Sequence, residues 1–205
     1  MTADDVDSFS SHRSDAVDTT GWTPASTALL VIDMVNDFCT EGGAMVLPES
    51  DWLYPVINEL AAGIRERGGL VLWIRDEHDE GDPEFRKRTR HCLSGSWGAQ
   101  IVDSLTLEPT DFVRPKHAFS AFYGTDLNEW LRRRGVTTLI LSGVVTNICV
   151  RSTAHDAFFH GFDVRVASDA CAGTSAREHE SSLYDLDTHY AHVATVADLL
   201  AGAKS

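Results

Sequence analysis

TLILSGVV, residues 138–145, is the most apolar run in the chain, and TNICV, residues 146–150, follows it directly. An unbroken apolar run of this kind is typical of a strand that is buried on both faces of a sheet. Thr146 and Asn147 carry side chains that cap helices, and Gly161 is a typical residue at a helix end. We therefore expect a helix that begins just after the strand and ends at Gly161.

The same alternation of apolar runs and amphipathic stretches continues in both directions from this segment. Strands are expected at residues 28–34, 70–76, 111–116, 138–145, 162–168 and 192–196. Helices are expected at residues 51–67, 98–105, 126–135, 146–160 and 176–190. This alternation predicts an α/β fold: a three-layer, doubly wound, mostly parallel six-stranded sheet with helices on both faces.

Length and charge limit the kinds of protein this chain can be. It has 205 residues and is 43% hydrophobic, enough for one globular domain with a sizeable core. Residues 1–22 are polar and acidic, so we expect a flexible acidic arm there and a single domain over residues 23–205. The net charge of −14 repels phosphate backbones and anionic lipids, which argues against nucleic acid and membranes as partners.

Cysteine spacing and hydropathy give the expected compartment. The four cysteines, Cys39, Cys92, Cys149 and Cys171, are widely spaced, and none forms a Cys-x-x-Cys pair. This pattern argues against a zinc knuckle and against a disulfide framework. No apolar run approaches the roughly 18 residues of a membrane span, and the first residues do not resemble a secretory signal. A cytoplasmic location is therefore expected.

Three residues that can carry chemistry are expected at one edge of the sheet, because parallel sheets bind ligands at the carboxyl ends of their strands. Asp33 ends the first expected strand, Lys116 ends the third, and Cys149 follows the fourth near a helix start. A thiol can attack a carbonyl, a carboxylate can take its proton, and a cation can keep that carboxylate ionised. The helix dipole would lower the pKa of Cys149, so we expect fast, selective labelling of this thiol. Taken singly, each residue also has an ordinary structural role, such as a packed thiol or a surface lysine.

The residues around these three positions carry longer motifs. DMVNDF occupies residues 33–38, KHAFSAFYGTDL occupies 116–127 and GVVTNICVRSTAHDAFFHGFDVRVASDACA occupies 143–172. Together they resemble the signature of the isochorismatase-like cysteine hydrolases. This superfamily includes nicotinamidases, N-carbamoylsarcosine amidases, and biuret and ureidoacrylate hydrolases. The three motifs stand in the family's order, and the resemblance extends over about residues 28–197.

The resemblance implies a role for each residue. Cys149 would be the nucleophile, Asp33 the general base and then the general acid, and Lys116 the charge stabiliser. Members of the superfamily hold a cis peptide bond that here would join Val144 to Val145. The backbone N–H groups of Val145 and Cys149 would then bind the oxyanion. Members are commonly dimers or tetramers, so a homo-oligomer is expected.

Asp76, His78 and His91 resemble part of the metal-binding segment of nicotinamidases. Asp76 and His78 keep the Asp-x-His spacing, and His91 begins a segment similar to the one that brings the last metal histidine. One carboxylate and two imidazoles suit Zn²⁺, Mn²⁺ or Fe²⁺. The acidic residues that follow His78 depart from the family pattern, as does Val35 in place of a common glutamine. The metal question therefore stays open, and the reaction is expected to proceed without a metal.

The expected activity is cysteine-dependent hydrolysis of the C–N bond in a small amide, carbamoyl or ureido compound through a thioester. The alternatives are a nicotinamidase with a bound metal, an isochorismatase-type vinyl-ether hydrolase and a non-catalytic member that binds a ligand. The vinyl-ether reaction needs no thiol, so Cys149 argues against it. Four aromatic residues are candidates for stacking on a planar substrate: Phe38, Trp97, Phe119 and Tyr123. The sequence does not identify the amide.

Overall fold

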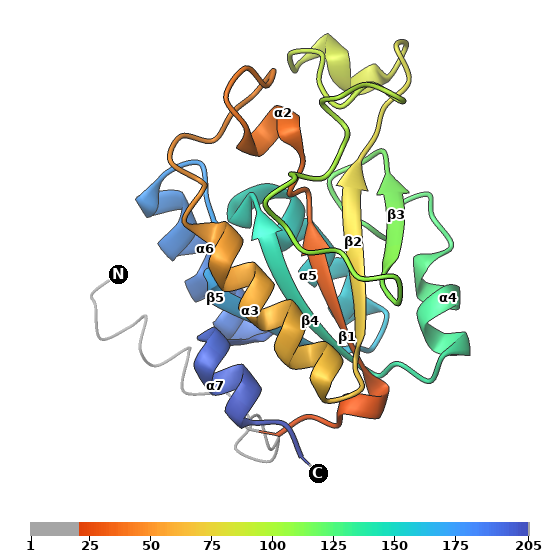
Figure 1. The fold of residues 1–205 in the computed structure, drawn as a ribbon, viewed down its shortest axis with the longest axis vertical. Helices are drawn as coiled ribbons and strands as arrows, with labels where there is room; N and C mark the ends of the chain where they lie inside the picture. Colours follow the sequence, from red (N-terminus) through yellow and green to blue (C-terminus); the bar gives the residue numbers. More distant parts are fainter. Residues whose placement is uncertain (1–20, 205) are drawn as a thin grey trace.

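A computed structural model describes residues 21–204, which fold around one six-stranded sheet (Figure 1). All paired strands run parallel, in the order β3-β2-β1-β4-β5-β6. The strands are β1 Thr27–Ile32, β2 Leu70–Asp76, β3 Phe112–Lys116, β4 Thr138–Val144, β5 Asp163–Ala172 and β6 His192–Ala194. The strand order reverses between β1 and β4, and such a reversal opens a crevice at the carboxyl ends of the strands. The predicted α/β class is confirmed.

Helices cover both faces of the sheet, which makes three layers (Figure 1). They are α2 Asn36–Cys39, α3 Leu53–Glu66, α4 Leu127–Arg133, α5 Arg151–Phe159, α6 Ala176–His189 and α7 Val196–Ala201. Successive side chains of a strand point to opposite faces. Leu29 and Val31 of β1 therefore pack with α3 and α7, whereas Leu30 and Ile32 pack with α4, α5 and α6. All six residues of β1 are buried, so this strand supplies both cores.

The helix expected at residues 98–105 is absent, and turns with an isolated bridge occupy that range. Its backbone pairs instead with the segment that follows β1. The N–H of Val102 donates to the carbonyl of Met34, and the N–H of Asn36 donates to the carbonyl of Gln100. These bonds use backbone groups that a helix would satisfy internally, so the prediction of a helix here is wrong. The short helices α2 and α7 were not predicted.

The turn after β4 also differs from the expected helix start. Residues Thr146–Val150 form one π-helical turn, η3, before α5 begins, and neither Thr146 nor Asn147 caps a helix. The Thr146 hydroxyl instead bonds Nδ1 of His179 at 2.8 Å, and the Asn147 amide donates to the hydroxyl of Thr174 at 3.0 Å. The two side chains therefore connect the turn to α6 and to the loop between β5 and α6, and they do not cap a helix.

The described part of the chain includes the last two residues of the expected arm, Gly21 and Trp22. Trp22 is 2% exposed, and its indole donates to the carbonyl of Leu199 in α7 at 2.6 Å. The expected acidic arm otherwise lies outside the described residues. Within residues 21–204, no helix combines the length and the apolar character that crossing a membrane would need.

Candidate active site

The three predicted residues meet at the carboxyl edge of the sheet, where Lys116 contacts both Asp33 and Cys149. Its ammonium lies 2.8 Å from Oδ2 of Asp33 and 3.8 Å from the sulfur of Cys149. It also lies 2.7 Å from Oδ1 of Asp76. All four side chains are buried, and Asp33 is 0% exposed. One buried cation thus contacts two carboxylates and a thiol.

Strand register accounts for this meeting. Asp76 and Lys116 are direct partners at the ends of β2 and β3. Ile32, the last residue of β1, pairs with Ile74 of β2, and the N–H of Asp33 then donates to the carbonyl of Ile74. Asp33 has φ 55°, so the chain turns sharply as it leaves the sheet. The carboxylate therefore stands where three neighbouring strands end.

Close contact between β4 and β1 brings the Cys149 turn to the same edge. Gly143 has φ 104°, and a Cβ atom there would lie 2.1 Å from the carbonyl oxygen of Ile32. Only glycine fits this conformation and this contact. The peptide bond between Val144 and Val145, just after this glycine, is cis. The π-helical turn that carries Cys149 begins one residue later.

The two carboxylates beside Lys116 differ in their readiness to hold a proton. Burial raises the pKa of Asp33, and although Lys116 opposes this effect, the pKa reaches about 7. Oδ1 of Asp33 is buried with no hydrogen-bond partner among the described residues. Burial acts on Asp76 too, but Lys116, His78 and His91 outweigh it and hold the pKa of Asp76 far below its ordinary value. Asp33 is therefore the carboxylate that can exchange a proton near neutral pH.

The expected low pKa of Cys149 is wrong. Burial raises the pKa of this thiol well above its ordinary value; Lys116 lowers it, while Asp33 and Asp76 raise it further. The expectation considered only the helix start and left out the burial of the thiol and its two carboxylate neighbours, which dominate here. In the resting site the thiol is therefore protonated and needs a base.

Asp76, His78 and His91 bring one ligand atom each to within 4.8 Å of one another, and all three residues are buried. Oδ2 of Asp76 lies 3.0 Å from Nε2 of His78 and 3.2 Å from Nε2 of His91. The other ring nitrogens are fixed as in metal sites: Nδ1 of His78 bonds Asp82 at 2.9 Å, and Nδ1 of His91 bonds the carbonyl of Thr89 at 2.7 Å. This donor set fits a divalent metal. The carboxylates of Asp76 and Asp82 outweigh the effect of burial and raise the pKa of His78 to about 9.

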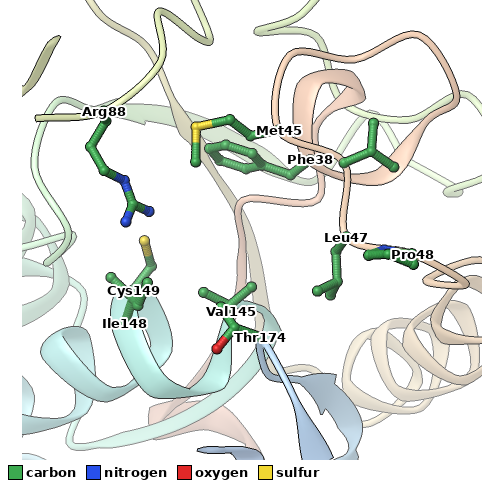
Figure 2. A pocket seen from close by; sticks show the side chains of 10 residues that line it. Phe38, Met45, Leu47, Pro48, Arg88, Val145, Ile148, Cys149 and Thr174 are labelled. Carbon is green, nitrogen blue, oxygen red and sulfur yellow. The ribbon is translucent and has the colours of Figure 1, made fainter.

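A cavity of about 240 Å³ opens at the thiol (Figure 2). It is lined by Phe38, Met45, Val46, Leu47, Pro48, Arg88, Val145, Ile148, Cys149 and Thr174. Of the four aromatic candidates, Phe38 is part of this wall. Trp97, Phe119 and Tyr123 are not, and Phe119 lines an adjacent hollow instead. Arg88 and residues 45–48 were not predicted to line the site, because they lie in irregular loops whose sequences show no periodicity.

A parallel α/β sheet with a buried aspartate, lysine and cysteine at its carboxyl edge is the arrangement expected of an isochorismatase-like hydrolase. The chain belongs to the isochorismatase family: the family model of the isochorismatase domain matches residues 27–198.

Relatives of this chain share most of its length. The ureidoacrylate amidohydrolase RutB of Enterobacter sp. (strain 638) is 35% identical, over 86% of this chain and 89% of that protein. An isochorismatase-like hydrolase from Alkaliphilus metalliredigens has a TM-score of 0.82 and is 34% identical, over 86% of this chain and 98% of its own. The pyrazinamidase of Pyrococcus horikoshii, solved in complex with zinc, has a TM-score of 0.78 and is 36% identical, over 83% of this chain and 99% of its own.

Proposed function

We propose that this protein is a cysteine-dependent amidohydrolase that cleaves the C–N bond of a small amide, carbamoyl or ureido compound. The observation that carries the proposal is the buried ammonium of Lys116, which contacts both the carboxylate of Asp33 and the thiol of Cys149. A nucleophile, a base and a cation thus stand within reach of one another beside a small cavity. The likeness to an amidohydrolase over most of both chains supports the same reaction class.

In the proposed reaction, Asp33 takes the proton from the Cys149 thiol as the sulfur attacks the substrate carbonyl carbon. The oxygen becomes an oxyanion, which the backbone N–H groups of Val145 and Cys149 bind. When the oxyanion collapses, the C–N bond breaks and Asp33 gives its proton to the leaving nitrogen. The carbonyl carbon is then held as a thioester.

Water completes the cycle. Asp33, again a carboxylate, takes a proton from the water that attacks the thioester, and the C–S bond breaks. The thiolate of Cys149 recovers this proton, and the acid product leaves. Lys116 stays charged throughout, because Asp33 and Asp76 raise its pKa well above the ordinary value despite its burial. Its role is to stabilise negative charge as that charge moves between Asp33, sulfur and substrate.

A second candidate is hydrolysis of a heteroaromatic amide such as nicotinamide by a metal-containing form. The observation that favours it is the cluster of Asp76, His78 and His91, whose donor atoms fit a divalent metal. A metal held there would act as a Lewis acid toward water or a ligand heteroatom. The zinc complex of a structurally similar pyrazinamidase supports this candidate. The vinyl-ether hydrolase and the non-catalytic member have no such observation in their favour.

Ammonia release from a substrate panel tests the proposal. The panel contains 3-ureidoacrylate, an N-carbamoyl amino acid, biuret and nicotinamide. We expect turnover of at least one compound, and Cys149→Ala should lower the rate by more than ~10³-fold while the protein stays folded. Cys171→Ala is the matched control. Cys171 is also buried, but its sulfur lies 4.0 Å from the carbonyl oxygen of Leu141 in β4 rather than beside Lys116. A Cys149→Ala rate within tenfold of the wild type would contradict covalent catalysis.

The expected assembly and location extend the proposal. We infer a homo-oligomer, either a dimer or a tetramer, that acts in the cytoplasm. Light scattering of the purified protein tests the assembly, and a monomeric mass would contradict it.

A further inference from the structure

Arg88 is the one cationic side chain among the described residues that line the cavity. Figure 2 shows its guanidinium pointing toward the thiol of Cys149 on the same side of the pocket. Most of the remaining cavity wall is apolar, formed by Phe38, Met45, Val46, Leu47, Pro48, Val145 and Ile148. The Arg88 side chain is 33% exposed, so water reaches part of the guanidinium, but its buried part is costly unless a ligand or a protein group satisfies it.

The protein itself satisfies this guanidinium poorly. Nε of Arg88 is buried and has no hydrogen-bond partner among residues 21–204. Oε1 of Glu84 lies 3.9 Å from Nε, which is too far for a hydrogen bond. The Phe119 ring lies 5.8 Å from the guanidinium carbon, and such a contact holds the side chain without satisfying its N–H donors. An acceptor brought by a ligand would fill this deficit.

The segment around Arg88 has the opposite charge from the rest of the protein. Arg86, Lys87, Arg88 and Arg90 stand within five residues of a chain whose net charge is −14. Lys87 and Arg88 line the hollow next to the cavity together with one acidic residue, Glu84, so the positive charges there outnumber the negative one. A local basic mouth on an acidic protein attracts small anions that the overall charge would repel.

We propose that Arg88 binds a carboxylate of the substrate, so that the preferred amides are small acids with an amide, carbamoyl or ureido group at the other end. This inference rests on the proposed function, which places the scissile carbonyl at Cys149, and it adds the specificity-determining residue. A guanidinium binds a carboxylate through two parallel N–H donors, which fixes both position and orientation. The apolar wall would contact the few carbons between the two ends.

Alkylation of Cys149 by a matched pair of reagents tests the charge at this site without any substrate. Iodoacetate and iodoacetamide have nearly the same size, but only iodoacetate carries a carboxylate. We expect Arg88→Met to lower the rate ratio of iodoacetate to iodoacetamide at Cys149 by at least ~10-fold, the scale of one charge-assisted contact. Mass spectrometry of the Cys149 peptide measures both rates.

Two further variants make this result specific. Arg86→Met removes the same charge from an exposed residue of the same segment that does not line the cavity, so its ratio should stay within about twofold of the wild type. Arg88→Lys keeps a cation and should retain most of the ratio. Equal losses in Arg88→Met and Arg86→Met would show a general charge effect and overturn the proposal, as would an unchanged ratio in Arg88→Met.

Hydrolysis of 3-ureidopropanoate and propylurea gives the second readout, because the two differ mainly in a terminal carboxylate. The wild type should prefer the acid by ~10²-fold in kcat/KM, and Arg88→Met should lose that preference, chiefly through a higher KM for the acid. Equal turnover of both compounds by the wild type would overturn the role of Arg88 but leave the proposed function intact. Failure to hydrolyse any amide in the panel would overturn the proposed function, and the alkylation ratio would still decide the role of Arg88.

Discussion

Asp33 and Asp76 share the ammonium of Lys116 but have opposite electrostatic surroundings. Asp76 also contacts two imidazoles, and its pKa is held far below the ordinary value. Asp33 contacts Lys116, and its pKa rises to about 7 because burial dominates and the charge of Asp76 adds to its effect. Two carboxylates with separated pKa values can take separate roles. Asp76 is a permanent counter-ion of the lysine, whereas Asp33 is free to accept and return a proton.

The pH dependence of kcat/KM should report Asp33. If this carboxylate is the base, only its ionised form is active, so kcat/KM should fall about tenfold for each pH unit below the pKa and level off above it. The midpoint is expected near pH 7, where burial places the pKa of Asp33. Initial rates between pH 4 and pH 9 measure it. A midpoint near 4, the value of an exposed aspartate, would contradict the raised pKa of Asp33.

Removing the base and the cation should not give additive losses. Asp33→Asn and Lys116→Met should each lower kcat/KM by at least ~10²-fold, the scale of acid–base and oxyanion groups. Because the two side chains contact each other at 2.8 Å and serve the same proton transfer, the double variant should be little worse than either single one. Rates from the three variants, with circular dichroism to confirm folding, test this. A double-variant loss equal to the product of the two single losses would separate their roles.

The sequence located the chemical residues better than the residues around them. Asp33 and Lys116 stand at the ends of recognisable strands, and their meeting follows from the parallel register. Arg88 and Met45 lie in irregular loops, whose paths depend on tertiary contacts rather than on local patterns. The pKa of Cys149 was predicted in the wrong direction, because the degree of burial and the two neighbouring carboxylates cannot be read from one segment alone.

At the level of elements, the approach of β4 to β1 is the most restrictive contact near the site. Gly143→Ala should lower the free energy of unfolding by at least about 2 kcal/mol, because the new methyl group meets the carbonyl oxygen of Ile32 and φ is 104°. It should also lower activity, because the substitution would displace Val145 and Cys149, whose backbone N–H groups are proposed to bind the oxyanion. Urea unfolding and a rate assay measure both effects.

Gly95→Ala is the matched control for this prediction. Gly95 also has a positive φ, 74°, but a Cβ atom there meets nothing within 4 Å. Its substitution should therefore cost only about 1 kcal/mol, from backbone strain alone. Similar losses at the two positions would show that the contact with Ile32 relaxes easily.

Strands were easier to predict than short helices and loops. The long apolar runs of β1, β2 and β4 stand out because buried parallel strands need no polar face. The short helix α7 has too few turns for a clear period. Residues 98–105 are amphipathic enough to suggest a helix, but their backbone bonds the segment after β1, a long-range contact that no local pattern reveals.

For the whole molecule, the metal content of the purified protein tests whether the cluster of Asp76, His78 and His91 binds an ion. We expect about one equivalent of a divalent metal, because one carboxylate and two imidazoles converge with their outer nitrogens already bonded. His78→Ala should lose this metal, whereas His155→Ala, a partly exposed histidine on α5, should keep it. Elemental analysis after incubation with zinc measures it. Equal metal contents in both variants would contradict binding at this cluster.

Chelation then separates the two activities. If EDTA removes the metal and nicotinamide turnover together, the heteroaromatic amide is favoured. If ureido turnover persists in the metal-free protein, the linear amide is favoured.

Much of the cavity wall comes from loops, although Val145 and Ile148 line it from the same turn as Cys149. Asp33, Lys116 and Asp76 are set by the sheet, whereas Met45, Val46, Leu47 and Pro48 belong to one irregular loop between α2 and α3, and Arg88 belongs to another. Mutations in these loops need not disturb strand pairing. New substrates can therefore arise in evolution by loop replacement alone, and a loop grafted from a relative should carry that relative's preference with it.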